Sequence, residues 1–245
     1  AGDAAALRAA LDRGGNVNAS NRARSSALHL ASGAGHAALV SQLVELRASV
    51  GATNASRETP LHNAANGGGS EAAATEIVEL LLRARAPIDA QDKSNGAALH
   101  VAARAGRAGV AASLLQHRAS IDLLNRDGNA PLALAAQAGH LGVVELLVSK
   151  RASVDGARLS LGLFCVVGRC AELHRHATPS SVIVGTHSIV AFLLSSQASV
   201  NATDSQQSAL FITLVRRGTR VVPALRMLMV AAMRTLAVTA FQGHL

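Results

Sequence analysis

A ten-residue phrase rich in alanine and leucine recurs four times in the first part of the chain. Its copies are SALHLASGAG from Ser26, TPLHNAANGG from Thr59, AALHVAARAG from Ala97 and APLALAAQAG from Ala130, with spacings of 33, 38 and 33 residues. A period of this length is the signature of a repeat architecture, in which each copy forms one structural unit. The chain is therefore expected to fold as a row of similar units.

A second phrase follows each copy of the first at the same period. It reads RASVGA from Arg47, RAPIDA from Arg85, RASIDL from Arg118 and RASVDG from Arg151. Between the two phrases lies an apolar run with Leu and Val at three- and four-residue spacing, which is typical of an amphipathic helix. Two markers that share one period argue against coincidence.

Each unit is interpreted as a short helix, a turn and a longer antiparallel helix. Ser26 and Thr59 are expected to cap the short helix, and Pro60 and Pro131 to occupy its first position, where a missing N–H costs nothing. A glycine such as Gly35 ends it, because glycine tolerates the left-handed conformation.

The inward face of the short helices is predicted from residues that recur in the phrase. These are Leu28, Leu61, Leu99 and Leu132, followed by the alanine pairs Ala64 and Ala65, Ala102 and Ala103, and Ala135 and Ala136. Alanine at those places lets a neighbouring helix approach closely. Because one unit cannot bury its apolar face alone, the units must stack into a solenoid.

The phrases TPLHNAA, AALHVAARAGR, APLALAAQAGH and SALHLASGAGH, with the loop phrases NVNA and SVNA, resemble the ankyrin repeat. The resemblance implies an all-α solenoid of stacked helix-turn-helix units with hairpin-like loops. It covers about residues 1–157, divided into a half-unit at 1–20 and full units at 21–53, 54–91, 92–124 and 125–157. The unit at 54–91 carries about five extra residues within 68–75, interpreted as a longer turn. Residues 158–245 are interpreted as degenerate repeats that end in a basic helix.

Charge and composition bound the function. The chain has a formal net charge of +8 and no Trp or Tyr, and after Asp204 it contains no acidic residue. This excess of basic residues leaves binding of nucleic acid or anionic lipid as an alternative function. Aromatic side chains for base stacking are scarce, however, and the sequence has no groove-reading motif, so nucleic acid is not the expected partner. The apolar stretch Val221–Phe241 contains Arg226 and Arg234, so no membrane span is predicted. Without a leader peptide, a monomeric, intracellular and cytoplasmic protein is expected.

Two groups of residues could suggest metal chemistry. His29, His62 and His100 share one repeat position, but stacked units would hold them about 10 Å apart, too far to share one ion. The resemblance implies instead that this histidine is structural and bonds loop backbone. Cys165, Cys170, His174 and His176 are zinc-type ligands in a spacing that structural zinc sites do not use. No metal and no cofactor is therefore expected.

The chain also lacks a glycine-rich phosphate loop, a paired carboxylate cluster and a nucleophile signature, so it is not expected to be an enzyme. The leading hypothesis is a non-catalytic protein-interaction module or scaffold. A targeting arm of a larger enzyme or channel remains a second alternative.

The resemblance implies that partners meet the loop tips and the short inner helices. Matched by position, the tips offer Arg22, Arg24, Arg57, Glu58, Lys93, Ser94, Arg126 and Asp127, and the ends of the first helices offer Asn66, Arg104 and Gln137. Six of these eleven residues are basic, so an acidic protein partner is expected.

Overall fold

The computed structural model describes Ala9 and residues 13–153. The chain divides into two compact units, Ala1–Ala152 and Ser153–Leu245, and the description concerns the first. The predicted degenerate repeats at 158–245, with Cys165, Cys170, His174 and His176, lie outside the described residues.

The described residues form eight helices in four antiparallel pairs. These are α2 (Ala27–Ala34) with α3 (Ala37–Glu45), α4 (Pro60–Asn66) with α5 (Glu71–Arg83), α6 (Ala98–Ala105) with α7 (Ala108–Gln116), and α8 (Pro131–Ala138) with α9 (Leu141–Ser149). One pair falls within each predicted full unit, while the exact division of residues 1–157 into units stays a prediction. None of the helices in the described residues combines the length and apolarity needed to cross a bilayer.

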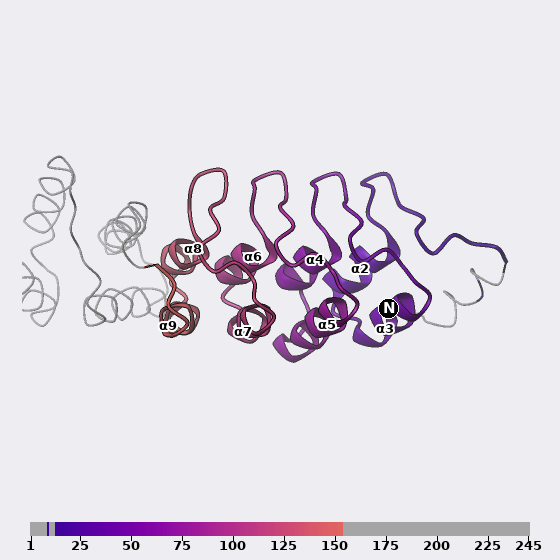
Figure 1. Ribbon diagram of the computed structural model, residues 1–245. Helices are drawn as coiled ribbons and strands as arrows, with labels where there is room; N and C mark the ends of the chain where they lie inside the picture. Colours follow the sequence, from indigo (N-terminus) through magenta and orange to yellow (C-terminus); the bar gives the residue numbers. More distant parts are fainter. Residues whose placement is uncertain (1–8, 10–12, 154–245) are drawn as a thin grey trace, which may run out of the picture. The chain divides into compact units, whose positions relative to one another are not determined.

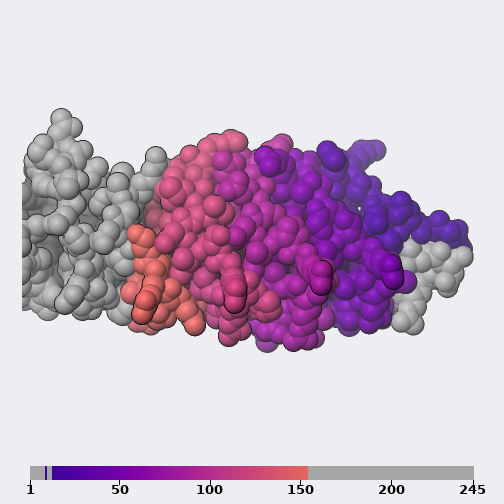
Figure 2. All heavy atoms as spheres, viewed as in Figure 1, coloured from indigo at the N-terminus to yellow at the C-terminus, as the bar shows by residue number. Residues whose placement is uncertain are grey.

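The helices lie in two layers (Figure 1). The first helices of the units, α2, α4, α6 and α8, contact one another in order and form the inner layer; α3, α5, α7 and α9 do the same in the outer layer. The hairpin-like loops that precede each inner helix, here called fingers, project from the inner layer side by side (Figure 1). In the space-filling view the units follow one another in chain order along this array (Figure 2).

The interior is continuous from unit to unit. Leu28, Leu61 and Leu132 are fully buried and Leu99 is 1% exposed, which confirms the predicted common core. The paired alanines of α4, α6 and α8 are also buried, because the inner helices contact each other across them. Small side chains at these contacts let the helices pack closely, as the sequence predicted.

The prolines and glycines at the ends of the inner helices lie where the sequence predicts them. Helices α4 and α8 begin at Pro60 and Pro131, and α2, α6 and α8 are followed by a glycine with φ of 79°, 73° and 83°. Two features disfavour any side chain at position 106: the φ angle of Gly106 is positive, and a Cβ there would lie 2.5 Å from the His140 ring.

The extra residues of the unit at 54–91 lengthen a helix more than a turn, so the interpretation of a longer turn was mostly wrong. The turn at 67–70 has four residues where the other units use two, but α5 has 13 residues against nine in α3, α7 and α9. Ser70 caps this helix by accepting the Ala73 N–H at 3.2 Å, and Glu71 sits in the first turn, where the helix dipole favours an acid. The alanines that follow are strong helix formers, which is why the insertion adds a helical turn.

Seven residues other than glycine adopt left-handed backbone conformations in the described part of the chain, with φ between 56° and 66°. Arg24, Arg57 and Asn95 do so at the finger tips, and Arg47, Arg85, Arg118 and Arg151 directly after the C-caps of the outer helices. This conformation costs a residue with a Cβ about 1–2 kcal/mol, a cost that glycine avoids.

Candidate functional site

Three buried histidines join the inner helices to the fingers. His29, His62 and His100 are each at most 3% exposed. The Nδ1 atom of His29 accepts the Ser26 N–H at 3.2 Å, and the equivalent bonds to His62 and His100 measure 3.2 and 3.1 Å. Because Nδ1 is an acceptor here, the ring proton belongs on Nε2.

The Nε2 atoms reach the finger of the next unit. They lie 3.0 Å from the carbonyl oxygen of Glu58, 3.0 Å from that of Gly96 and 3.2 Å from that of Asn129. Each ring thus bonds a finger to the inner helix of the preceding unit, which confirms the structural role predicted for these histidines.

Burial favours the neutral form of two of these rings, those of His29 and His100. Desolvation lowers the pKa of His29 and of His100 below the usual value of 6.5, and it outweighs the opposing backbone hydrogen bonds to Glu58 and Asn129 respectively. Protonation would place a second N–H on Nδ1, facing the backbone N–H that this atom accepts.

Each finger tip is built by one polar side chain. The Oδ1 atom of Asn54 accepts the N–H groups of Ser56 and Glu58 at 2.8 and 3.0 Å, which is the geometry that favours Asn and Asp in turns. Asp92 does the same for Ser94 and Gly96 at 2.7 and 2.8 Å. Although burial alone would raise the pKa of Asp92, the hydrogen bonds from Ser94 and Gly96 prevail and lower it.

Backbone bonds hold neighbouring tips in a row. The Ala55 N–H donates to the Ala23 carbonyl at 2.9 Å, Lys93 N–H to Ser56 at 3.0 Å, and Arg126 N–H to Ser94 at 2.7 Å. The tip residues predicted from the sequence therefore follow one another along one edge of the array.

The structure places the eleven predicted residues in two zones. Seven of them are exposed at the finger tips: Arg22, Arg24, Arg57, Lys93, Ser94, Arg126 and Asp127. Asn66 and Arg104 are exposed at the ends of α4 and α6, and Glu58 and Gln137 are half-buried. Of the eleven, Glu58, Asn66 and Arg104 line one shallow hollow of about 240 Å³ on the inner layer.

The hollow lies over α4 and reaches its neighbours α2 and α6. It is lined by Gly33, Glu58, His62, Asn63, Asn66, Gly67, Gly68, Asp92, Val101 and Arg104. Asn63 is the residue that sequence reasoning missed most clearly. The other copies of the phrase carry Leu30, Val101 and Leu134 at its position, so a polar residue at an otherwise apolar position was the available signal.

The charged side chains around the hollow differ in whether they already make hydrogen bonds within the protein. The Asp92 carboxylate is engaged by its own finger, and a Glu58 carboxylate oxygen accepts the Asn54 side-chain amide at 2.8 Å. The guanidinium of Arg104 makes no hydrogen bond or ion pair within the described part of the chain. It is the charge best placed to meet an incoming anionic group.

Among residues 13–153, no three His, Cys, Asp or Glu side chains lie close enough together to hold a metal ion. What the inner layer offers is a rigid row of tips and a polar hollow.

Comparison with known families agrees with this architecture. A family model described as ankyrin repeats (3 copies) matches residues 1–82 and 70–157. No curated protein matches the chain.

Proposed function

Since the chain belongs to the ankyrin-repeat family, whose repeats are generally protein–protein interaction modules and typically non-catalytic, we propose that residues 13–153 bind an acidic segment of a protein partner through the finger tips and the hollow over α4. The single observation that carries this proposal is the convergence of Glu58, Asn66 and Arg104 on one hollow beside the row of basic tips. In this role the array works as a scaffold.

The physical support comes from rigidity and charge. Three buried imidazoles and the backbone bonds between tips hold the surface in place before a partner arrives, so little ordering entropy opposes binding. Five of the exposed predicted residues at the tips are Arg or Lys, and Arg104 adds a sixth beside the hollow. A partner carboxylate at Arg104 would also have the Asn66 side chain within the same hollow.

Photocrosslinking in the cell of origin tests the location. A photoreactive amino acid replaces Asn66 in the full chain, and a matched control replaces Glu145, which is exposed on the outer helix α9. We expect a discrete crosslinked protein from position 66, and loss of that band when Arg57 and Arg104 are changed to Ala. Equal crosslinking from both positions, or a band that survives the two changes, would refute the proposed face.

A further inference from the structure

Four arginines form a second basic feature, away from the finger tips. Arg47, Arg85, Arg118 and Arg151 each follow the C-cap of an outer helix and occupy the same position in four consecutive units. We call this set the basic ridge. All four residues are exposed, and none makes a hydrogen bond or ion pair with its side chain in the described part of the chain.

The backbone conformation of the ridge is the first reason to look for a role. All four residues are left-handed, with φ of 58°, 63°, 66° and 65°. Glycine would adopt this conformation freely, and a cation near a helix C-terminus recovers only part of the cost. Strained backbone that recurs at one position in four consecutive units is typical of a functional constraint.

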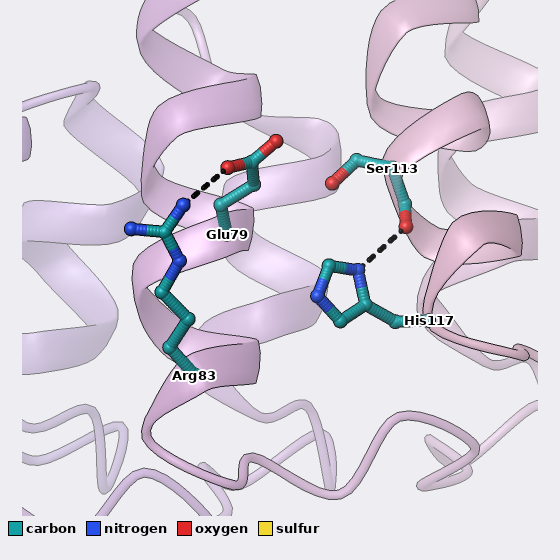
Figure 3. Close-up of polar contacts among 4 residues, drawn as sticks. All are labelled: Glu79, Arg83, Ser113 and His117. Atoms are coloured by element: carbon teal, nitrogen blue, oxygen red, sulfur yellow. Dashed lines mark hydrogen bonds and ion pairs between the residues drawn. The ribbon is translucent and has the colours of Figure 1, made fainter.

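Two basic residues close to the ridge, Arg83 and His117, are already engaged by their own helices. Arg83 pairs with Glu79 on its own helix α5 at 3.1 Å (Figure 3). The His117 ring turns back to the Ser113 carbonyl of α7 at 3.0 Å (Figure 3). Arg85 follows Arg83 by two residues, and Arg118 follows His117 directly. Neither of these ridge arginines has such a partner for its side chain in the described part of the chain.

The spacing of the ridge fits a helix. Packed helices lie about 8–10 Å apart, so equivalent residues of consecutive units stand about 10 Å apart and the four span about 30 Å. Residues seven apart on an α-helix are separated by about 10.5 Å and share one face, with a drift of about 20° per heptad that an arginine side chain can follow.

The surroundings favour a narrow partner over a broad anionic surface. Exposed carboxylates of the outer helices, Glu45, Glu76 and Glu145, would repel a duplex or a membrane laid across this side. Residues 13–153 contain no Phe, Trp or Tyr on which bases could stack. We propose that the basic ridge binds an acidic helix of a partner protein, one whose carboxylates recur every seven residues. The ridge uses other residues than the finger tips and the hollow, so this proposal can be tested independently of the proposed function.

The test uses two variants of the full chain that lose the same charge. In the ridge variant Arg47, Arg85, Arg118 and Arg151 are changed to Gly, a residue that suits their backbone, so folding is retained. In the tip variant Arg24 and Arg57 become Gly, and Arg22 and Arg126 become Ser. The probe is a fluorescently labelled alanine–glutamine helix with four glutamates, one every seven residues. A control peptide carries the same four glutamates scattered around the helix.

Fluorescence anisotropy gives the dissociation constants. We expect the ridge variant to bind the heptad peptide about 10- to 100-fold more weakly than the original chain, from four exposed ion pairs. The tip variant should stay within about threefold, because exposed charges more than a Debye length from the peptide are screened. The original chain should prefer the heptad peptide to the scattered one.

Other outcomes overturn the proposal. Equal weakening in both variants would mean that only net charge matters, and weakening confined to the tip variant would move the acidic partner to the fingers. Duplex DNA or phosphatidylglycerol vesicles that bind as tightly as the peptide, and lose that binding in the ridge variant, would replace the helix with another class of partner.

Discussion

Within residues 13–153, side-chain hydrogen bonds link the bases of neighbouring fingers, and the junction between Gly51 and Pro87 lacks such a bond. The Oδ1 atom of Asn18 accepts the Ser49 N–H at 2.8 Å. Two units later, the Oδ1 atom of Asp89 accepts the Ser120 N–H at 3.0 Å, and its second oxygen accepts the Ser120 hydroxyl. These bonds tie the start of one finger to the preceding one.

At the junction between them, both partners are replaced. Gly51 stands at the acceptor position and Pro87 at the donor position, and proline has no N–H to give. The backbone of Gly51 is not left-handed, and a Cβ there would meet Pro87 carbon atoms at 3.6 and 3.7 Å, which is ordinary contact. The site can therefore accept an asparagine without strain.

We predict that Gly51→Asn and Pro87→Ser together restore the missing bond. Gly51→Asn alone gains no donor, and Pro87→Ser alone loses about 0.4–1 kcal/mol, because the unfolded chain becomes freer. The double variant should exceed the sum of the two single changes by about 0.5–1.5 kcal/mol, the net value of one hydrogen bond.

Urea unfolding followed by circular dichroism measures this coupling in a double-mutant cycle on the full chain. The mirrored cycle, Asn18→Gly with Ser49→Pro, removes an existing bond and serves as the control, with an expected coupling of the same sign and size. A coupling below about 0.3 kcal/mol at Gly51 and Pro87 lies within the error of additivity and refutes the reasoning.

Three further predictions follow from the core, the histidines and the left-handed arginines. Leu99→Ala should lower the free energy of unfolding by about 2–5 kcal/mol in urea titrations, since this side chain is 1% exposed, and no loss would place it outside the core. Burial lowers the pKa of His29 and His100 in the folded state, so the unfolded chain binds more protons below pH 6.5. The free energy of unfolding contributed by these residues should therefore be complete above pH 6.5 and should fall as the pH drops toward the lowered pKa. Melting temperatures that stay unchanged from neutral pH into weak acid would contradict this. Arg118→Gly should raise the free energy of unfolding by up to about 1 kcal/mol, whereas the same change at the helical residue Arg104 should lower it; a loss at both positions would argue against backbone strain.

The sequence predicts those features that depend on one unit and its immediate neighbours. Leu61 is buried because the phrase repeats, and Pro60 begins a helix because its ring suits only the first turn. The hollow could not be predicted in the same way, since Asn63, Asp92 and Arg104 come from two units and meet only after stacking. The conformation of Arg85 was equally hidden, because arginine itself gives no sign of a left-handed backbone.

The hollow and the irregular unit at 54–91 have a common origin. The inserted turn bonds to α2 through the Gly68 N–H and the Gly33 carbonyl at 3.1 Å, and a Cβ on Gly67 would lie 2.7 Å from that carbonyl oxygen. From the other side, the Arg107 guanidinium donates to the carbonyls of Gly67 and Gly69. The turn is thus fixed by both neighbouring units, and three glycines, at 33, 67 and 68, contribute backbone and no side chain to the lining of the hollow. The regular two-residue turns lack this glycine run, so the hollow is a feature of the irregular unit and of its contacts with both neighbours.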